Sequence, residues 1–175
     1  MGDIKHSLKN SADLQRQPHS LGKVIIYNQD LADMPEIQDG SIDAVVAVSA
    51  LEHNTPEGLV GVVSELMRVL KPGGNLLATM CAAREADWYH QPSSGWCYSD
   101  ASLRRSFSLP EDTPSNYAEY DRIMDGIRNC AELRDHLASF YFKSANNGMP
   151  MGIWDPKYPP VGVLKHKPGS SSAGG

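Results

Sequence analysis

The sequence predicts an α/β fold built around a parallel β-sheet. Three features support this prediction: a short apolar run at Asp43–Val48, an amphipathic helical pattern between Thr55 and Leu70, and a second strand-like run at Asn75–Met80. Strand, helix and strand at this spacing form a βαβ unit, whose crossover is right-handed in nearly all known proteins. With 175 residues, the chain has the length of one domain with a hydrophobic core.

Two segments precede the βαβ unit. Residues 1–22 are polar and weakly patterned, so we expect a loose N-terminal segment there. Val24–Tyr27 has the sequence VIIY, which predicts a short buried strand. Residues 33–40 combine proline, aspartate and glycine and predict a loop.

The first strand and the start of the helix have clear sequence signals. After its first residue, Asp43–Val48 is continuously apolar, which is typical of a strand buried on both faces of a parallel sheet. Thr55 is suited to cap the helix, Pro56 to occupy its first position, and Glu57 to place a negative charge near the positive end of the helix dipole.

The rest of the helix shows one apolar face and a sharp end. The residues on this face follow helical spacing: Leu59, Val62, Val63, Leu66 and Leu70. The sequence KPGG at positions 71–74 ends the helix, because proline and glycine cannot easily continue it.

Beyond Cys81 the composition changes. Residues 85–114 are rich in Trp, Tyr, Ser and Pro and contain one short helical pattern near Ser99–Phe107. Apolar spacing predicts two more helices, and the residues that mark them are Tyr120, Ile123, Met124 and Ile127 for one and Leu133, Leu137 and Tyr141 for the other. Residues 146–160 suggest turns around short strands, and Val161–Leu164 a last strand. We therefore expect a domain over residues 23–167 and a flexible tail over 168–175.

Composition limits the classes of function. A net charge of −5 argues against an extended basic surface for nucleic acid. No apolar stretch approaches the ~20 residues that span a bilayer, and the N-terminus lacks the apolar segment of a secretory signal. Cys81, Cys97 and Cys130 are widely spaced and form no zinc-like group, so no metal site is expected. Reduced thiols in a cytoplasmic protein are the simplest interpretation, and a catalytic or redox cysteine is the alternative.

The segment from Asp30 to Met80 resembles the second half of the cofactor domain of class I S-adenosylmethionine (SAM)-dependent methyltransferases of the type 11 group. Three motifs carry the resemblance in order, namely DLADMP, IDAVVAVSALEH and RVLKPGG. The resemblance implies a Rossmann-like three-layer sandwich, with a cofactor half over residues 23–80 and a substrate-side half over 81–167. It also implies SAM as the cofactor.

The resemblance assigns candidate cofactor-binding residues. Asp30 and Leu31 match the pair that contacts adenine, through a carboxylate and a backbone amide. The alternative for Asp30 is a purely local role in capping the turn that follows. Ser49, Ala50 and Leu51 match the segment beside the methionine end and methyl group of SAM, at the carboxyl end of a strand where open α/β sheets bind ligands.

The resemblance also suggests residues for the reaction and the acceptor. His53 stands where the family commonly has histidine and is the candidate catalytic residue, as a general base. The alternative is a histidine that shapes the pocket or binds a backbone carbonyl. Five residues after Cys81 are candidates for an aromatic wall against the acceptor, or for packing under a long loop: Trp88, Tyr89, His90, Trp96 and Tyr98.

One part of the family pattern has no counterpart here. The glycine-rich turn after the first strand and the acidic residue after the second are missing, since Gly2 and Gly22 are isolated. We therefore expect an N-terminally truncated sheet. Either Val24–Tyr27 lies beside Asp43–Val48, or a partner chain or second copy completes the sheet.

Two functions follow from these observations. The first is a SAM-dependent methyltransferase that acts, without a metal, on a small-molecule acceptor rather than on nucleic acid. The second is a non-catalytic methyltransferase-like partner subunit or truncated pseudoenzyme. The intact Asp30 and Ser49–His53 segments favour the first, and the missing glycine turn favours the second. A serine hydrolase and a nucleotide-phosphate binder are disfavoured, because no GxSxG, P-loop or GxGxxG motif occurs.

Overall fold

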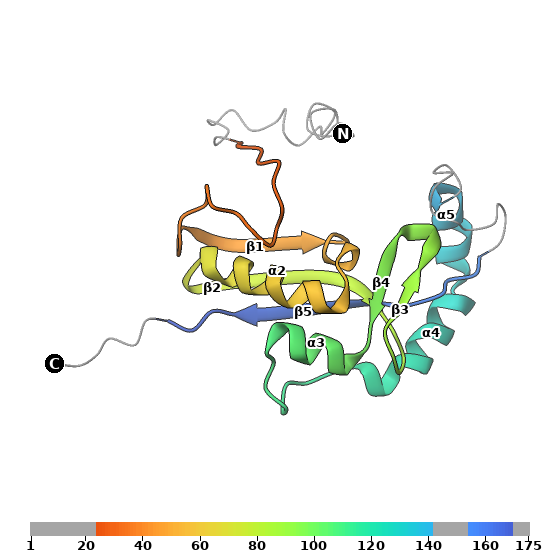
Figure 1. Cartoon of the computed structure of the whole chain (residues 1–175). Helices are drawn as coiled ribbons and strands as arrows, with labels where there is room; N and C mark the ends of the chain where they lie inside the picture. Colours follow the sequence, from red (N-terminus) through yellow and green to blue (C-terminus); the bar gives the residue numbers. More distant parts are fainter. Residues whose placement is uncertain (1–23, 142–153, 170–175) are drawn as a thin grey trace, which may run out of the picture.

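A five-stranded open sheet organises the chain in a computed structural model that describes residues 24–141 and 154–169 (Figure 1). The strands are β1 (Ile42–Val48), β2 (Leu70–Ala82), β3 (Trp88–His90), β4 (Gly95–Tyr98) and β5 (Pro160–His166). The α-helices are α2 (Pro56–Val69), α3 (Asp100–Phe107), α4 (Tyr120–Asn129) and α5 (Ala131–Tyr141). Short 3-10 turns are η2 (Leu51–His53), η3 (Gln91–Ser93) and η4 (Tyr117–Glu119).

Strand β2 is the centre of the sheet. β1 runs parallel along one of its edges. On the other edge, β5 runs antiparallel to Asn75–Cys81. β4 runs parallel beside Cys81 and Ala82, and because Cys81 also pairs with β5, β4 lies on the edge opposite β5, beyond the end of β1. β3 completes an antiparallel hairpin with β4. An open sheet with α2 as the crossover from β1 to β2 confirms the predicted α/β class.

Helix α2 forms as its sequence signals indicate. The Thr55 side chain accepts a hydrogen bond from the Gly58 amide at 3.1 Å, and Pro56 is the first helical residue. The buried face consists of Leu59, Val62, Val63, Leu66 and Val69. Leu70 already belongs to β2, so the helix ends one residue earlier than the apolar pattern suggests.

The KPGG sequence makes a bulge at the start of β2. Leu70 pairs with Ile42, whereas the next pair joins Ala44 to Asn75, so residues 71–74 have no partners in the register. β2 therefore begins earlier than the predicted Asn75. A Cβ atom on Gly74 would lie 2.8 Å from the carbonyl oxygen of Asp43, which leaves room only for glycine.

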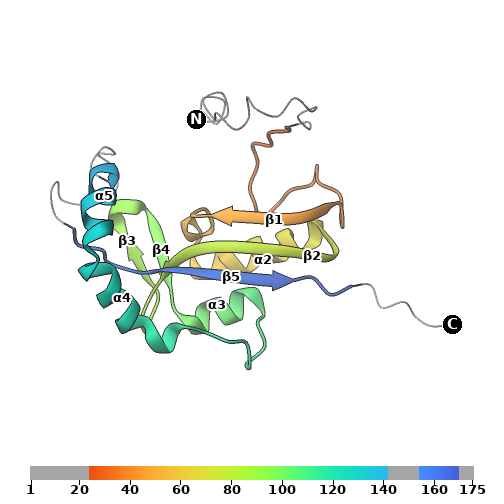
Figure 2. The same cartoon turned by 180° about the vertical axis from the view of Figure 1, so that it is seen from behind.

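The helices are distributed unevenly around the sheet. α2 and α3 cover one face, and α4 and α5 lie beside the β3–β4 hairpin (Figure 1). Seen from behind, β1, β2 and β5 lie in front of α2 (Figure 2). The hydrophobic core lies between α2, α3 and the covered face of the sheet, and includes Leu59, Val62, Leu76, Ala78 and Phe107.

Two predictions about strand burial are wrong. Val24–Tyr27 forms no strand, and its side chains are exposed, from 48% for Tyr27 to 71% for Val24. β1 is buried on only one face, since Val46 and Val48 are 65% and 66% exposed. Strand propensity alone does not supply a pairing partner, and within the described residues β1 pairs with β2 only.

The later elements agree better with the sequence. α3 has Ser99 as its N-cap, with its hydroxyl 3.3 Å from the Ser102 amide, and α4, α5 and the last strand are also present. The β3–β4 hairpin was not predicted. The N-terminal segment 1–22, most of the turn-rich segment 146–160 and most of the tail lie outside the described residues. In the part of the chain that is described, no helix is long and apolar enough to cross a membrane.

Candidate active site at the carboxyl ends of β1 and β2

A cavity of about 390 Å³ lies at the carboxyl ends of the parallel strands β1 and β2. Ser49 follows β1, and Thr79, Met80 and Cys81 come from β2. The other lining residues are Glu52, His90, Ser93, Ile127, Leu133, Trp154, Pro156, Lys157, Tyr158 and Pro160. The volume is within the range of small-molecule sites, and open α/β sheets bind ligands at this position.

Ser49 turns the chain sharply into the cavity wall. Its φ is 47°, in the left-handed region that residues with a side chain seldom adopt. Its amide lies 3.1 Å from the carbonyl oxygen of Thr79 and 3.3 Å from the Thr79 hydroxyl, which ties the end of β1 to β2. Unfavourable backbone geometry of this kind is concentrated at functional sites.

Glu52 is the most unusual polar residue of the cavity. It is only 6% exposed, and among the described residues its Oε2 atom has no hydrogen-bond partner. The turn that carries it is held by Tyr98, whose hydroxyl donates toward the carbonyl oxygens of Leu51 at 3.0 Å and Asn54 at 2.7 Å. A buried carboxylate oxygen without a donor is costly, so this geometry calls for a functional explanation.

Two thiols and a phenol lie along one side. Cys81 of β2 is paired in register with Cys97 of β4, and both are free and buried. A hydrogen bond with Cys97 holds the pKa of Cys81 below its ordinary value, and it raises that of Cys97. Burial raises the pKa of Tyr158, so this phenol keeps its proton near neutral pH.

His90 is fixed by neighbouring rings and by a serine. Its Nδ1 atom is 2.7 Å from the Ser93 hydroxyl, and its ring makes edge contacts with Trp88 and Tyr158. Burial, and secondly the charge of Lys157, lower the pKa of His90, so the imidazole is neutral at pH 7. Its neutral ring can accept or donate a hydrogen bond at the cavity.

The predicted residues after β1 take different positions. Ser49 lines the cavity, Ala50 precedes η2, and Leu51 is fully buried in the core. His53 is not among the lining residues. Its Nδ1 atom is 2.9 Å from the Ser94 carbonyl oxygen, and because a carbonyl only accepts, Nδ1 is the donor. Its role as a base stays a prediction.

Asp30 and Leu31 lie on the surface. One carboxylate oxygen of Asp30 accepts a hydrogen bond from the Ala32 amide at 2.9 Å, as in a local turn. Leu31 is 38% exposed, and neither residue lines the cavity. Their predicted contact with adenine stays a prediction.

The aromatic residues after Cys81 do not form a continuous wall. Tyr98 is fully buried, Trp96 packs against the core, and Tyr89 is 42% exposed. Of the five predicted residues, only His90 lines the cavity, which also contains Trp154 and Tyr158. Sequence reasoning missed these two because β5 and the segment before it return to β2 only in the folded chain. Glu52 is part of the IDAVVAVSALEH motif, but no role was predicted for it. Its position next to apolar residues in this motif could have identified it as a candidate.

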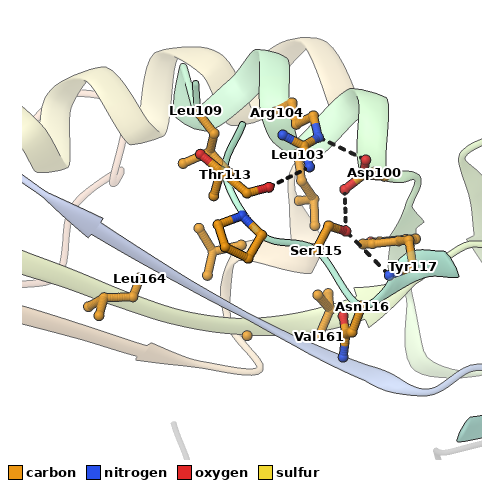
Figure 3. A pocket seen from close by; sticks show the side chains of 13 residues that line it. Asp100, Leu103, Arg104, Leu109, Thr113, Ser115, Asn116, Tyr117, Val161 and Leu164 are labelled. Atoms are coloured by element: carbon orange, nitrogen blue, oxygen red, sulfur yellow. Dashed lines mark hydrogen bonds and ion pairs between the residues drawn. The ribbon is translucent and has the colours of Figure 1, made fainter. Parts of the chain in front are cut away.

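A second cavity, of about 570 Å³, lies between α3, the loop that follows it and β5 (Figure 3). Several of its polar groups bind one another. Arg104 binds Asp100 at 2.8 Å and the Thr113 carbonyl oxygen at 2.9 Å, and Ser115 donates to Asp100 at 2.9 Å (Figure 3). Arg104 thus holds the loop in place. We therefore take the smaller cavity, with its unpaired carboxylate, as the candidate site.

Neither cavity contains a metal centre built from described residues. Within residues 24–141 and 154–169, no group of three or more histidine, cysteine, aspartate or glutamate side chains has the arrangement to hold an ion.

Comparison with solved structures gives partial likenesses. A SAM-dependent methyltransferase from Methanosarcina mazei is 14% identical, with 59% of this chain and 60% of that chain covered and a TM-score of 0.46. Phosphoethanolamine N-methyltransferase 2 of Haemonchus contortus is 16% identical, with coverages of 67% and 29% and a TM-score of 0.42. The [4+2]-cyclase SpnF is 27% identical, with coverages of 46% and 30% and a TM-score of 0.39. The chain thus spans about 30% to 60% of the length of these proteins.

The comparison with curated proteins gives no match. Residues 2–78 match the family model of the methyltransferase domain. This segment contains β1, α2 and most of β2, together with Ser49 and Glu52 of the candidate site. Over residues 2–78, less than half of the chain, the sequence is therefore similar to the methyltransferase domain, in agreement with the resemblance that the sequence motifs indicate.

Proposed function

We propose that this chain transfers a methyl group from SAM to a small-molecule acceptor at the cavity beside β1 and β2. One observation supports the proposal most strongly. The cavity lies at the carboxyl ends of two parallel strands in the segment that matches the methyltransferase domain, and its wall contains a buried carboxyl oxygen without a hydrogen-bond partner among the described residues.

Several residues would hold the cofactor. The methionine end of the cofactor would lie beside Ser49, Ala50 and Leu51, which bind it or shape its site. The adenine would lie beside Asp30 and Leu31. The polar groups at the cavity suit a polar ligand, because Ser49, Thr79 and Glu52 line it and offer two hydroxyl groups and a carboxyl group. When bound, SAM supplies a methyl group activated by a positively charged sulfur.

The acceptor is a small molecule in this proposal. A cavity of about 390 Å³ suits a compact ligand, and a net charge of −5 does not favour a polyanion. His53 would act as the base through its Nε2 atom, because the Ser94 carbonyl holds Nδ1.

Calorimetric titration of the full chain with SAM and with S-adenosylhomocysteine tests the proposal. We expect micromolar binding of both. Asp30→Ala should weaken binding by about tenfold, because a hydrogen bond to a charged group is worth roughly 1.5–3 kcal/mol. Asp33→Ala, in the same exposed loop, is the matched control and should bind like the unmodified chain.

A folded chain that binds neither compound at millimolar concentration contradicts the proposal. Circular dichroism and a cooperative thermal transition establish folding in the same sample. If the Asp30→Ala variant binds as tightly as the unmodified chain, Asp30 does not contact the cofactor, and its role is the local hydrogen bond with the Ala32 amide.

The free edge of β1 supports a proposal about partners, namely that a second copy of the chain completes the sheet. β1 pairs only with β2 among the described residues, and Val46, Val48, Leu77 and Leu164 are exposed. Antiparallel pairing of β1 with its own copy about a twofold axis would satisfy the free backbone groups and bring Val46 and Val48 of both copies together.

Light scattering coupled to size exclusion tests the second copy. We expect the mass of a dimer for the unmodified chain and a shift toward the monomer for Val46→Thr/Val48→Thr. We would measure at a protein concentration of about 100 µM, where even a weak dimer forms. The mass of a monomer at this concentration would contradict the proposed dimer.

The cysteines support a cytoplasmic location. Cys81, Cys97 and Cys130 are all free thiols, and Cys81 and Cys97 are neighbours that an oxidising compartment would tend to join. Thiol titration of the native chain, purified under nitrogen, should give three free thiols after denaturation.

A further inference from the structure

The Glu52 side chain is buried at the cavity, and one of its carboxyl oxygens receives no hydrogen bond from the described residues. Glu52 is 94% buried, being 6% exposed, and it borders the cavity. No described residue donates to its Oε2 atom. An ionised carboxylate accepts hydrogen bonds only, so a donor at this position has to come from outside the described protein groups.

Of the lining residues that the structure describes, the one with a cationic side chain already has a partner. Lys157 forms an ion pair with Asp155, and its side chain is 51% exposed. His90 is neutral at pH 7 because burial lowers its pKa. Glu52 is the acidic side chain among the described lining residues, and Lys157, which pairs with Asp155, leaves it without a cationic partner there.

The rest of the wall suits the apolar body of a ligand. Trp154 and Tyr158 contribute aromatic rings, and Ile127 and Leu133 contribute aliphatic side chains. Trp154 is anchored by its indole N–H, which donates to the Ile127 carbonyl oxygen at 3.0 Å. Aromatic rings next to a carboxylate favour a positively charged nitrogen through both charge and cation–π attraction.

We propose that this cavity binds a small arylalkyl or alkyl amine, with its ammonium group on the Glu52 carboxylate. The identification of this amine as the methyl acceptor rests on the function proposed above. The amine site itself rests only on the burial of Glu52, its unpaired oxygen and the composition of the cavity wall.

The test is a titration of the full chain, without cofactor, with phenethylamine and with its neutral analogue 2-phenylethanol. The two probes share the aromatic body and differ in charge. We expect the amine to bind about 10- to 100-fold more tightly, the factor given by a charge-assisted hydrogen bond. Glu52→Gln, which keeps the size of the side chain, should abolish this preference. Glu57→Gln, an exposed glutamate in the first turn of α2, is the matched control and should retain it.

Equal binding of the two probes by the unmodified chain overturns the proposal, and this result needs no variant. Retention of the preference in Glu52→Gln overturns it as well. A third titration, with S-adenosylhomocysteine, separates the two sources of an ammonium group. One outcome is that Glu52→Gln weakens binding of S-adenosylhomocysteine and that the unmodified chain binds phenethylamine and 2-phenylethanol equally. In that case Glu52 binds the cofactor, and the proposed amine site is wrong. If the chain prefers phenethylamine but binds no S-adenosylhomocysteine, the amine site stands and the proposed methyl transfer fails.

Discussion

Gly95 packs tightly against the Glu52 side chain, so that a larger residue at position 95 would require this side chain to move by a few tenths of an ångström. A Cβ atom on Gly95 would lie 3.2 Å from the Cγ atom and 3.6 Å from the Cβ atom of Glu52. Gly95 is buried at the start of β4, and Glu52 is in the turn after β1. The β3–β4 hairpin therefore determines the position of the carboxylate at the cavity.

Gly95→Ala should displace Glu52 and weaken amine binding. We expect a loss of about 1–3 kcal/mol in the free energy of unfolding, typical of overpacking at a buried position. We also expect a loss of the preference for phenethylamine over 2-phenylethanol. Urea unfolding and the probe titrations measure the two effects. Gly61→Ala in α2 is the control, because nothing lies within 4 Å of its added methyl group, and it should be neutral or stabilising.

Gly74→Ala should destabilise the fold without a direct effect on the cavity. Its methyl group would lie 2.8 Å from the Asp43 carbonyl oxygen and 2.9 Å from that of Lys71. Relief requires movement of the backbone, so we expect a loss of about 2 kcal/mol or more by urea unfolding. A stability equal to that of Gly61→Ala would show that the bulge at residues 71–74 is not fixed as described.

Arg68 and Glu65 should make stability depend on acid pH. Hydrogen bonds from Arg68, and secondly from the Met34 amide, lower the pKa of Glu65 to about 2 from the ordinary 4.5. The stabilisation is therefore complete above pH 4.5 and is lost as the pH falls through about 2. Glu65→Gln should flatten this part of the curve of unfolding free energy against pH. If the unfolding free energy of the variant depends on pH as that of the unmodified chain does, the loss of stability at acid pH comes from other carboxylates.

Arg68→Met should detach the loop before β1. The guanidinium donates to the carbonyl oxygens of Met34 and Ile37, each at 2.9 Å, and also pairs with Asp39. We expect a lower free energy of unfolding, because two carbonyl groups lose their guanidinium donor and Glu65 keeps only the Met34 amide. Faster proteolysis within residues 33–40 should accompany it. Arg122→Met, in an exposed pair with Glu119, should have little effect on either measurement.

Lys167→Met should loosen the end of α2. The Lys167 ammonium is 2.6 Å from the carbonyl oxygens of Met67 and Leu70 and 3.2 Å from that of Arg68. These carbonyls lie at the helix end and have no partner within the helix, so we expect a loss of about 1–2 kcal/mol in thermal or urea unfolding. Lys165→Met is the control, since its ammonium makes one long contact of 3.5 Å with Ser108. Equal effects of the two substitutions would exclude a specific capping role.

The parts of the fold that were predicted well are those specified by local signals. The cap at Thr55, the proline at position 56 and the spacing of Leu59, Val62 and Leu66 define α2, because they act within a few residues of one another. The site was predicted less completely. Ser49 was identified by its place after a strand, whereas Trp154 and Tyr158 reach the cavity from residues more than 100 positions later.

The burial of Val24–Tyr27 and of β1 could not be predicted for a related reason. An apolar strand shows that a partner or a covering layer is favourable, but it does not show that one is present. Among the described residues the covering layer exists only on the α2 side, so Val45 and Ala47 are shielded there and Val46 and Val48 are not.

By itself, the sequence determined the βαβ unit and the similarity to the methyltransferase domain, because helix caps, apolar periodicity and the DLADMP, IDAVVAVSALEH and RVLKPGG motifs are local properties of the chain. Only the tertiary structure decided which side chains share the cavity and that Glu52 is buried there with one carboxyl oxygen unpaired among the described residues. Burial and hydrogen-bond pairing depend on contacts between distant segments, here η2, the β3–β4 hairpin and the residues before β5, and no local pattern encodes those contacts.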